Sequence, residues 1–159
     1  GQGVAPPTAP AGVAVNEFDL NAVANASGTQ NILCVTGTAA ACGSTSLAGR
    51  TSTTLEAVAI TGGGVTASPI ARTFFYFMHP GQDQTLGTGD DYSVLIGSDE
   101  SASLRVVTGS TDRNWVFSSV LSTSVLPAAS AGQNMNVYAI GVDAQGDAVL
   151  SQAVVFDVR

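Results

Sequence analysis

Side chains able to perform nucleophilic or acid–base chemistry are few in this sequence. Its only histidine, His79, stands at the end of an apolar run, in the segment Phe77-Met78-His79-Pro80-Gly81. Nucleophilic catalysis needs a Ser, Thr or Cys activated by a base, and no Gly-x-Ser-x-Gly motif occurs. We interpret His79 as a strand-end residue beside a turn, and we predict that the protein is not an enzyme.

The 12 acidic residues are spread along the chain. The close sets, Asp90-Asp91 and Asp99-Glu100, fall in or beside predicted loops, where neighbouring carboxylates are usually solvated. Loop carboxylates from Asp83, Asp90 and Asp91 would suit a calcium ion, because hard cations prefer oxygen ligands. Their spacing matches no EF-hand. We therefore predict no cofactor and no metal site, with calcium binding as the alternative.

Two cysteines, Cys34 and Cys42, close the short loop CVTGTAAAC. A redox pair prefers Cys-x-x-Cys spacing and zinc needs four ligands, so both alternatives fit poorly. A disulfide is the favoured interpretation, and it implies an oxidising compartment. Asn25-Ala26-Ser27 matches the acceptor pattern for glycosylation, which makes Asn25 a candidate site.

Charge is scarce in this chain, and lysine is absent. Only 11% of its 159 residues are charged, against about a quarter in an average soluble domain. The formal net charge of −7 argues against nucleic acid and anionic membranes as partners, and no apolar run approaches the roughly 20 residues of a membrane span. The start Gly1-Gln2-Gly3 is typical of a mature chain after signal-peptide removal, although a trimmed chain would begin similarly. We therefore expect a secreted, extracellular or cell-surface protein.

Alternating apolar residues and β-branched side chains predict an all-β protein. The expected strands are separated by Gly-, Asp-, Asn- and Ser-rich turns and cover residues Val13–Val23, Asn31–Thr36, Leu55–Thr61, Ala71–Met78, Tyr92–Gly97, Ser103–Thr108, Trp115–Leu121, Asn136–Val142 and Val149–Val158. About nine short strands with regular turns indicate an antiparallel β-sandwich. Residues 1–12 form a flexible Pro-rich arm, residues 13–54 a charge-poor strand and loop segment with the disulfide, and residues 55–159 the sandwich.

The last two predicted strands form a hairpin. Tyr138, Ile140 and Val142 share one face, and the turn Asp143-Ala144-Gln145-Gly146-Asp147 has hairpin chemistry. On the return strand the face is expected to hold Leu150, Val154, Phe156 and Val158, with polar Gln152 as the exception. This stretch resembles the final two strands of bacterial extracellular immunoglobulin-like domains. The resemblance implies an immunoglobulin-like sandwich and says little about function.

The segment that follows the arm carries alternating apolar residues. Val13 and Val15 alternate with small or polar residues, and Phe18, Leu20 and Ala22 continue in the opposite phase, a shift that we interpret as a bulge. An extended apolar segment behind a Pro-rich arm is suited to adding a strand to another sheet. In position and alternation it resembles the donor strand of pilins that polymerise by donor-strand exchange, which places the candidate donor at residues 13–24. The alternative is that it forms the first strand of its own domain.

These features predict a non-enzymatic structural subunit that binds copies of itself. A charge-poor surface lacks the usual deterrents to edge-to-edge association, and head-to-tail contacts that do not close build a filament. The expected assembly is a pilus-like extracellular filament or surface array. The alternative is an adhesion module that binds carbohydrate or a host surface. Aromatic residues for that role would be Trp115, Tyr76, Tyr92 and Tyr138, although a core position is the ordinary interpretation of Trp115.

Overall fold

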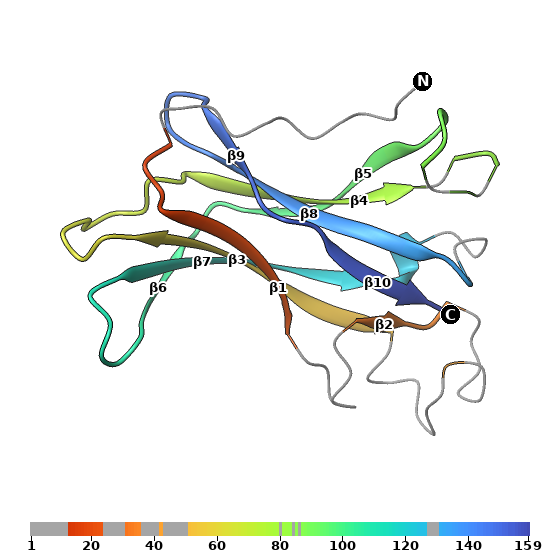
Figure 1. Ribbon diagram of the computed structural model, residues 1–159, viewed down its shortest axis with the longest axis horizontal. Coiled ribbons are helices and arrows are strands. Elements are labelled where there is room, and N and C mark those ends of the chain that lie inside the picture. The colour runs from red at the N-terminus through yellow and green to blue at the C-terminus, as the bar shows by residue number, and fades with distance from the viewer. Residues whose placement is uncertain are drawn as a thin grey trace.

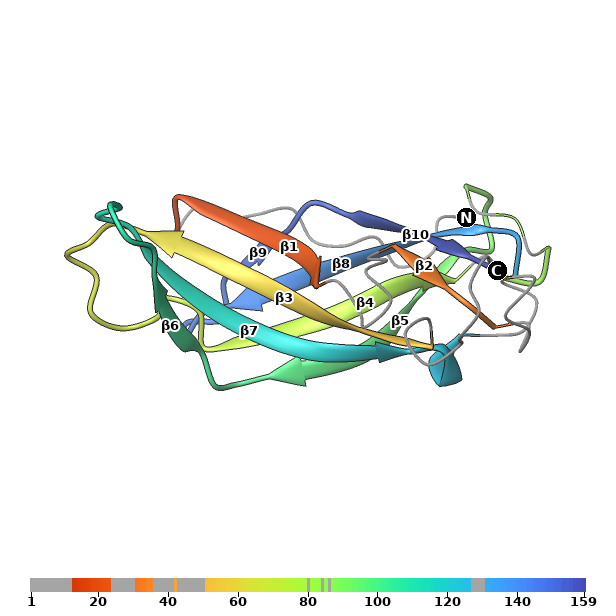
Figure 2. The same ribbon diagram turned by 90° about the horizontal axis from the view of Figure 1, so that it is seen from below.

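Two β-sheets packed face to face make up this protein (Figures 1 and 2). The computed structural model describes residues 13–23, 31–35, 42, 51–79, 81–83, 85, 87–126 and 131–159. Within these residues the regular structure is almost entirely strand. The predicted all-β antiparallel sandwich is therefore confirmed. The arm predicted for residues 1–12 lies outside the described residues.

The described residues place four strands in sheet A, in the order β1-β3-β7-β6. Their bounds are Glu17–Val23 for β1, Ser52–Thr61 for β3, Arg113–Ser122 for β7 and Ser103–Val106 for β6. Every neighbouring pair is antiparallel, so strand direction alternates across the whole sheet. Among the described strands, β1 and β6 are the two edges of this sheet.

Sheet B has the order β2-β10-β8-β4-β5, and β9 also pairs with β8. The strands are β2 (Ile32–Leu33), β4 (Arg72–His79), β5 (Tyr92–Asp99), β8 (Asn134–Val142), β9 (Ala148–Leu150) and β10 (Val154–Val158). A 3-10 turn, η1 (Thr123–Val125), follows β7. No helix within the described ranges has the length and apolar character needed to cross a membrane.

The core lies between the two sheets and follows the period-two pattern of the strands. Alternate residues of each strand point inward because successive side chains of a strand face opposite sides. The largest fully buried side chains are Phe75, Phe77, Phe117, Phe156, Leu20, Leu33, Leu55, Ile70, Leu121, Met135, Val137 and Val158. Few aromatics are needed, because aliphatic side chains from both sheets fill the remaining volume.

The last predicted strand is divided, and one prediction about its face is wrong. β9 ends at Leu150 and β10 begins at Val154, so the residues between them interrupt the pairing with β8. Val149 points into the core, whereas Leu150 pairs with Ile140 on the opposite face. Leu150 therefore does not share a face with Val154. The interruption resets the alternation, which the period-two pattern could not anticipate.

The hairpin turn between β8 and β9 has the predicted chemistry. The Asp143 carboxylate accepts hydrogen bonds from the backbone N–H groups of Gln145 and Asp147, both at 2.9 Å. Gly146 has a φ of 88°, a left-handed conformation that favours glycine. The side chain and the glycine together fix the reversal of the chain.

Candidate functional site

The candidate donor residues lie in the sheet of their own chain. β1 pairs with β3 along its full length, and Phe18, Leu20 and Ala22 point into or against the core. Val13 and Val15 precede the strand and pack against the same core. Residue 24, the last of the candidate segment, is outside the described residues. Donation of this strand to another copy stays a prediction.

The change of phase before β1 comes from a tight turn. The Val15 N–H donates to the Val13 carbonyl at 2.9 Å, and the Asn16 N–H donates to the Ile60 carbonyl at 2.8 Å. The strand therefore begins at Glu17, four residues later than predicted from Val13. The bulge expected between Val15 and Phe18 is replaced by this turn.

β1 packs closely on sheet B near its first residues. Gly141 of β8 faces the core, and a Cβ atom at this position would lie 2.6 Å from Ile70 and 3.1 Å from the Phe18 ring. Only a residue without a side chain lets the two sheets approach this closely. Phe18 is therefore a specific anchor of β1 in its own sandwich.

The Gln152 side chain holds the outer edge of β1. Its amide NH2 donates to the Leu20 carbonyl at 2.7 Å, and its amide oxygen accepts from the Leu20 N–H at 3.0 Å. Gln152 belongs to the interruption between β9 and β10, and it reaches from sheet B to the edge of sheet A. It therefore occupies the position at which another strand would pair with Leu20.

The contact between Gln152 and β1 was not predicted from the sequence, although the sequence marks Gln152 as unusual. Gln152 is the one polar residue that breaks the apolar alternation of the last predicted strand. The neighbouring Ser151 takes over part of the pairing with β8, because its hydroxyl accepts the Ala139 N–H at 2.8 Å. This leaves the Gln152 side chain free to turn toward β1.

The second edge of sheet A, β6, exposes apolar side chains. All four of its residues are exposed, and the sequence Leu104-Arg105-Val106-Val107 presents three large aliphatic side chains to solvent. The charge on this strand is already neutralised, since Arg105 forms an ion pair with Glu56 at 2.9 Å. An edge strand without free charge or proline lacks the usual protection against pairing with another chain.

The outward face of β1 carries two acids. Glu17 and Asp19 are two residues apart in the strand, so their side chains leave the same face of the sheet. A hydrogen bond to the Asp19 carboxylate, together with its negative charge, raises the pKa of Glu17. A cation brought to this face would relieve the repulsion between the two groups.

The loop between β4 and β5 brings together the three acids of the calcium alternative. One carboxylate oxygen from each of Asp83, Asp90 and Asp91 lies within 4.8 Å of the others. The Asp83 N–H donates to Asp90 at 3.0 Å, the Thr88 hydroxyl donates to Asp90 at 2.8 Å, and the Gly87 N–H donates to Asp91 at 2.6 Å. These local bonds are typical of Asp-rich turns and account for the grouping.

His79 and Tyr92 lie at the base of this loop. The two rings stack with centroids 4.5 Å apart, and the Gly81 N–H donates to the His79 Nδ1 at 2.9 Å. Burial lowers the pKa of His79, which favours the neutral ring. The His79 ring therefore stabilises the turn that follows β4, as expected for a strand-end residue.

Trp115 is a core residue. Its indole N–H donates to the Thr61 hydroxyl at 3.1 Å, and the ring is buried between the sheets. It therefore cannot serve as an exposed platform for a sugar. Tyr76 and Tyr138 stack on the outer face of sheet B, and Tyr92 is 44% exposed.

The predicted cysteine pair lies at disulfide distance. Cys34 and Cys42 are joined, with their Cα atoms 5.7 Å apart, which is typical of a disulfide. Cys34 follows β2, and the Val35 N–H donates to the carbonyl of Arg159 at 2.6 Å. Val35 and the Cys42 side chain therefore both lie beside Arg159, which directly follows β10. Asn25, the candidate glycosylation site, lies outside the described residues.

Comparison with known proteins adds no family to this description. No model of a known protein family matches the chain, and no curated protein matches it. The functional argument therefore depends on the two edges of sheet A.

Proposed function

We propose that this protein is a non-enzymatic structural subunit of an extracellular, pilus-like filament or surface array, in which copies associate through β-strand contacts. The observation that carries the proposal is that sheet A, within the described residues, ends in two edge strands, β1 and β6. β6 exposes apolar side chains and has no free charge, and β1 is held at its outer edge by Gln152. Such edges are templates for pairing with another chain.

Strand direction supports a head-to-tail contact between the two edges. Direction alternates across β1, β3, β7 and β6, so β1 and β6 run in opposite directions. A second copy placed beside the first by simple translation would set its β6 antiparallel to β1. The contact uses two different surfaces and leaves one free edge at each end, and contacts of this kind build filaments when they do not close.

The charges on the two edges are complementary. β1 carries Glu17 and Asp19 on its outward face, and β6 carries Arg105. In a β1–β6 contact the guanidinium, which is paired with Glu56 in its own copy, would also come near the acid pair of the other copy. Association would require Gln152 to release Leu20 first.

A finer form of the proposal is exchange of β1 itself. In this form, β1 of one copy leaves its sheet and pairs with β3 of the next copy, as in donor-strand exchange or domain swapping. Phe18, Leu20 and Ala22 would then fill the same core positions in the neighbour. The cysteine pair and the scarcity of charge support an extracellular location, where disulfides persist.

The edge contact is tested by a matched pair of charge substitutions. Val106 on the edge strand β6 and Val120 on the interior strand β7 are both 60% exposed. Val106→Lys should abolish assembly, because a lysine on an edge strand opposes pairing, whereas Val120→Lys should assemble normally. The assay is sedimentation and negative-stain microscopy, with circular dichroism to verify folding. Equal assembly by both variants would refute the β6 contact.

Exchange of β1 is tested separately by cysteine trapping. Val23 and Thr54 are register partners in β1 and β3. When Val23→Cys copies are mixed with Thr54→Cys copies and oxidised, exchange predicts a disulfide between the two copies, mapped by mass spectrometry. Simple edge pairing predicts none, because β1 then stays on its own β3. A chain carrying both substitutions should be locked as a monomer until it is reduced.

A second candidate is an adhesion module that binds carbohydrate. Exposed Tyr92 stacked on His79 supports it, because sugars bind to aromatic faces. Glycan-array binding that is lost in Tyr92→Ala and kept in Val120→Lys would favour this role. An array without binding would exclude it for the sugars tested.

A further inference from the structure

The outer face of sheet B is apolar and aromatic, which is unusual for a sheet face that points away from the core. Phe75 and Phe77 of β4 point inward, so Phe74, Tyr76 and Met78 point outward. On β8 their outward neighbours are Tyr138, Ile140 and Val142, and β9 adds Leu150. By contrast, the outward residues of β1 and β3 in sheet A include Glu17, Asp19, Asn21, Thr54 and Glu56.

The aromatic rings on this face form a connected row. The rings of Tyr76 and Tyr138 stack with centroids 5.5 Å apart, and Phe74 lies 6.5 Å from Tyr76. The Arg72 guanidinium sits 5.7 Å from the Phe74 ring. The Tyr138 hydroxyl is hydrogen-bonded to Ser93 of β5, which fixes the ring across the sheet. The row therefore forms a continuous aromatic strip on the outer face of sheet B.

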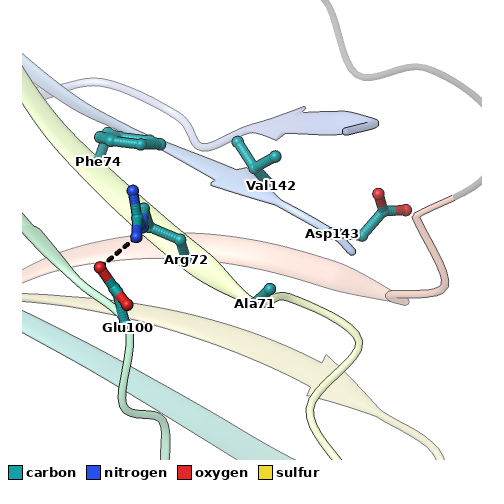
Figure 3. Close-up of a pocket in the computed structure, with 6 residues that line it drawn as sticks. All are labelled: Ala71, Arg72, Phe74, Glu100, Val142 and Asp143. Atoms are coloured by element: carbon teal, nitrogen blue, oxygen red, sulfur yellow. Dashed lines mark hydrogen bonds and ion pairs between the residues drawn. The ribbon is translucent and has the colours of Figure 1, made fainter. Parts of the chain in front are cut away.

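A shallow pocket lies at each end of this row. The first has a volume of about 320 Å³ and is lined by Ala71, Arg72, Phe74, Glu100, Val142 and Asp143. Figure 3 shows Arg72 paired with Glu100 beside Phe74, and the Asp143 carboxylate is the second acidic group of this pocket. The second, of about 270 Å³, is lined by Met78, Asn136, Tyr138, Leu150, Ser151 and Ala153. Two shallow pockets joined by aromatic rings form the kind of groove that binds polyproline II segments.

The chain contains a segment of the required chemistry in residues 1–12. It carries no charged side chain, and Pro7-Thr8-Ala9-Pro10 is a P-x-x-P sequence that follows Pro6. In a polyproline II helix with three residues per turn, Pro7 and Pro10 share one face. Such segments dock on aromatic grooves because little conformational entropy is lost on binding.

The starting point and the length of this segment both fit the groove. Figures 1 and 2 show the chain entering β1 at the same end of the sandwich as the β8–β9 turn. The first pocket lies at this end, because Asp143 of the turn lines it. Twelve residues of polyproline II span about 37 Å. The eight residues of β4 span about 26 Å. A segment that starts at this end is therefore long enough to reach the second pocket.

We propose that the outer face of sheet B is a polyproline II binding site, and that its occupant is the Pro-rich segment 4–10 of the same chain. The prolines pack on the Phe74, Tyr76 and Tyr138 rings, and the segment covers the apolar face. This role is independent of the edges of sheet A and goes beyond assembly through them.

Photocrosslinking in the full chain tests this site. The crosslinking residue p-benzoylphenylalanine is placed at position 4, and these copies are mixed with heavy-isotope copies that lack it. The expected products join position 4 to peptides containing Met78, Tyr138 or Leu150 of the same copy. The double substitution Pro7→Gly with Pro10→Gly should lower the yield of these crosslinks several-fold. Tyr76→Ser should lower it as well, whereas Val120→Lys on sheet A should leave it unchanged.

Three results would overturn the proposal. Crosslinks to heavy-isotope copies would make a second copy the occupant. Crosslinks to the outer face of sheet A would place the segment elsewhere, and an absence of defined crosslinks would mean that it does not dock. Val106→Lys distinguishes this site from the proposed function, because it should abolish assembly and leave the crosslinks from position 4 unchanged.

Discussion

Replacement of Gln152 by alanine should loosen β1 without unfolding the sandwich. The change removes two hydrogen bonds to Leu20, of 2.7 and 3.0 Å. A net hydrogen bond contributes about 0.5–1.5 kcal/mol. Because Gln152 is exposed and water can reach the vacated groups, we expect a total loss of about 1–2 kcal/mol. The loss falls on the opening of β1, since the rest of the core is untouched.

Amide hydrogen exchange measures this opening directly. A loss of 1–2 kcal/mol corresponds to a roughly 5- to 30-fold increase in the population of the open state. The amides of Leu20 and its neighbours in β1 should exchange faster by this factor. The amide of Phe117, in the middle of β7, should exchange at an unchanged rate. Assembly should begin sooner, because the edge at Leu20 is open.

Gln145→Ala is the matched control. Gln145 is an exposed glutamine in the β8–β9 turn, and its backbone N–H makes the hydrogen bond to Asp143. Its substitution should leave exchange in β1 unchanged. The reasoning would be refuted if Gln152→Ala left the Leu20 amide as protected as before, or if β1 and β7 lost protection equally.

Three further substitutions or titrations probe the sandwich itself. Thr73 has a fully buried hydroxyl that finds no hydrogen-bond partner among the described residues, so Thr73→Val should raise the free energy of unfolding by about 1 kcal/mol in urea titrations. A decrease would show that the hydroxyl is bonded. Trp115→Phe removes the hydrogen bond to Thr61 and leaves a cavity, so it should lower the free energy of unfolding by roughly 2–3 kcal/mol in the same assay. Unchanged stability would contradict the buried contact. The N–H of Asp83, and then the Thr88 hydroxyl, lower the pKa of Asp90 from 3.8 to about 2. Its stabilising contribution is therefore present above pH 3.8 and is lost as the pH falls through about 2. NMR titration should find the Asp83 amide signal unchanged at pH 4, and an earlier change would argue against this bond.

Strand positions were accessible from the sequence because burial on one face imposes a period of two. The residues of β3, β4, β7 and β8 that belong to the core cluster alternate along each strand. The turn at Asp143–Asp147 was equally accessible, since Asp and Gly have specific backbone roles there. Local patterns of this kind require no knowledge of which strands are neighbours.

The edges of sheet A could not be read from the sequence. Which strand is an edge depends on long-range pairing, and β6 and β1 differ little from interior strands in their local pattern. The role of Gln152 depends on the interruption at 151–153, which moves Leu150 to the outer face and directs Gln152 toward Leu20. A single polar residue in an apolar strand marks such a site without identifying its partner.

Association of this chain with its own copies is the central claim, and negative-stain electron microscopy of the purified full chain tests it most directly. The account predicts filaments that grow across the strands. Their subunit repeat should be about 20–25 Å, because sheet A has four strands and the main path of sheet B five, at 4.7–4.9 Å per strand. Dispersed single particles at every concentration, with the edges of sheet A intact, would contradict it.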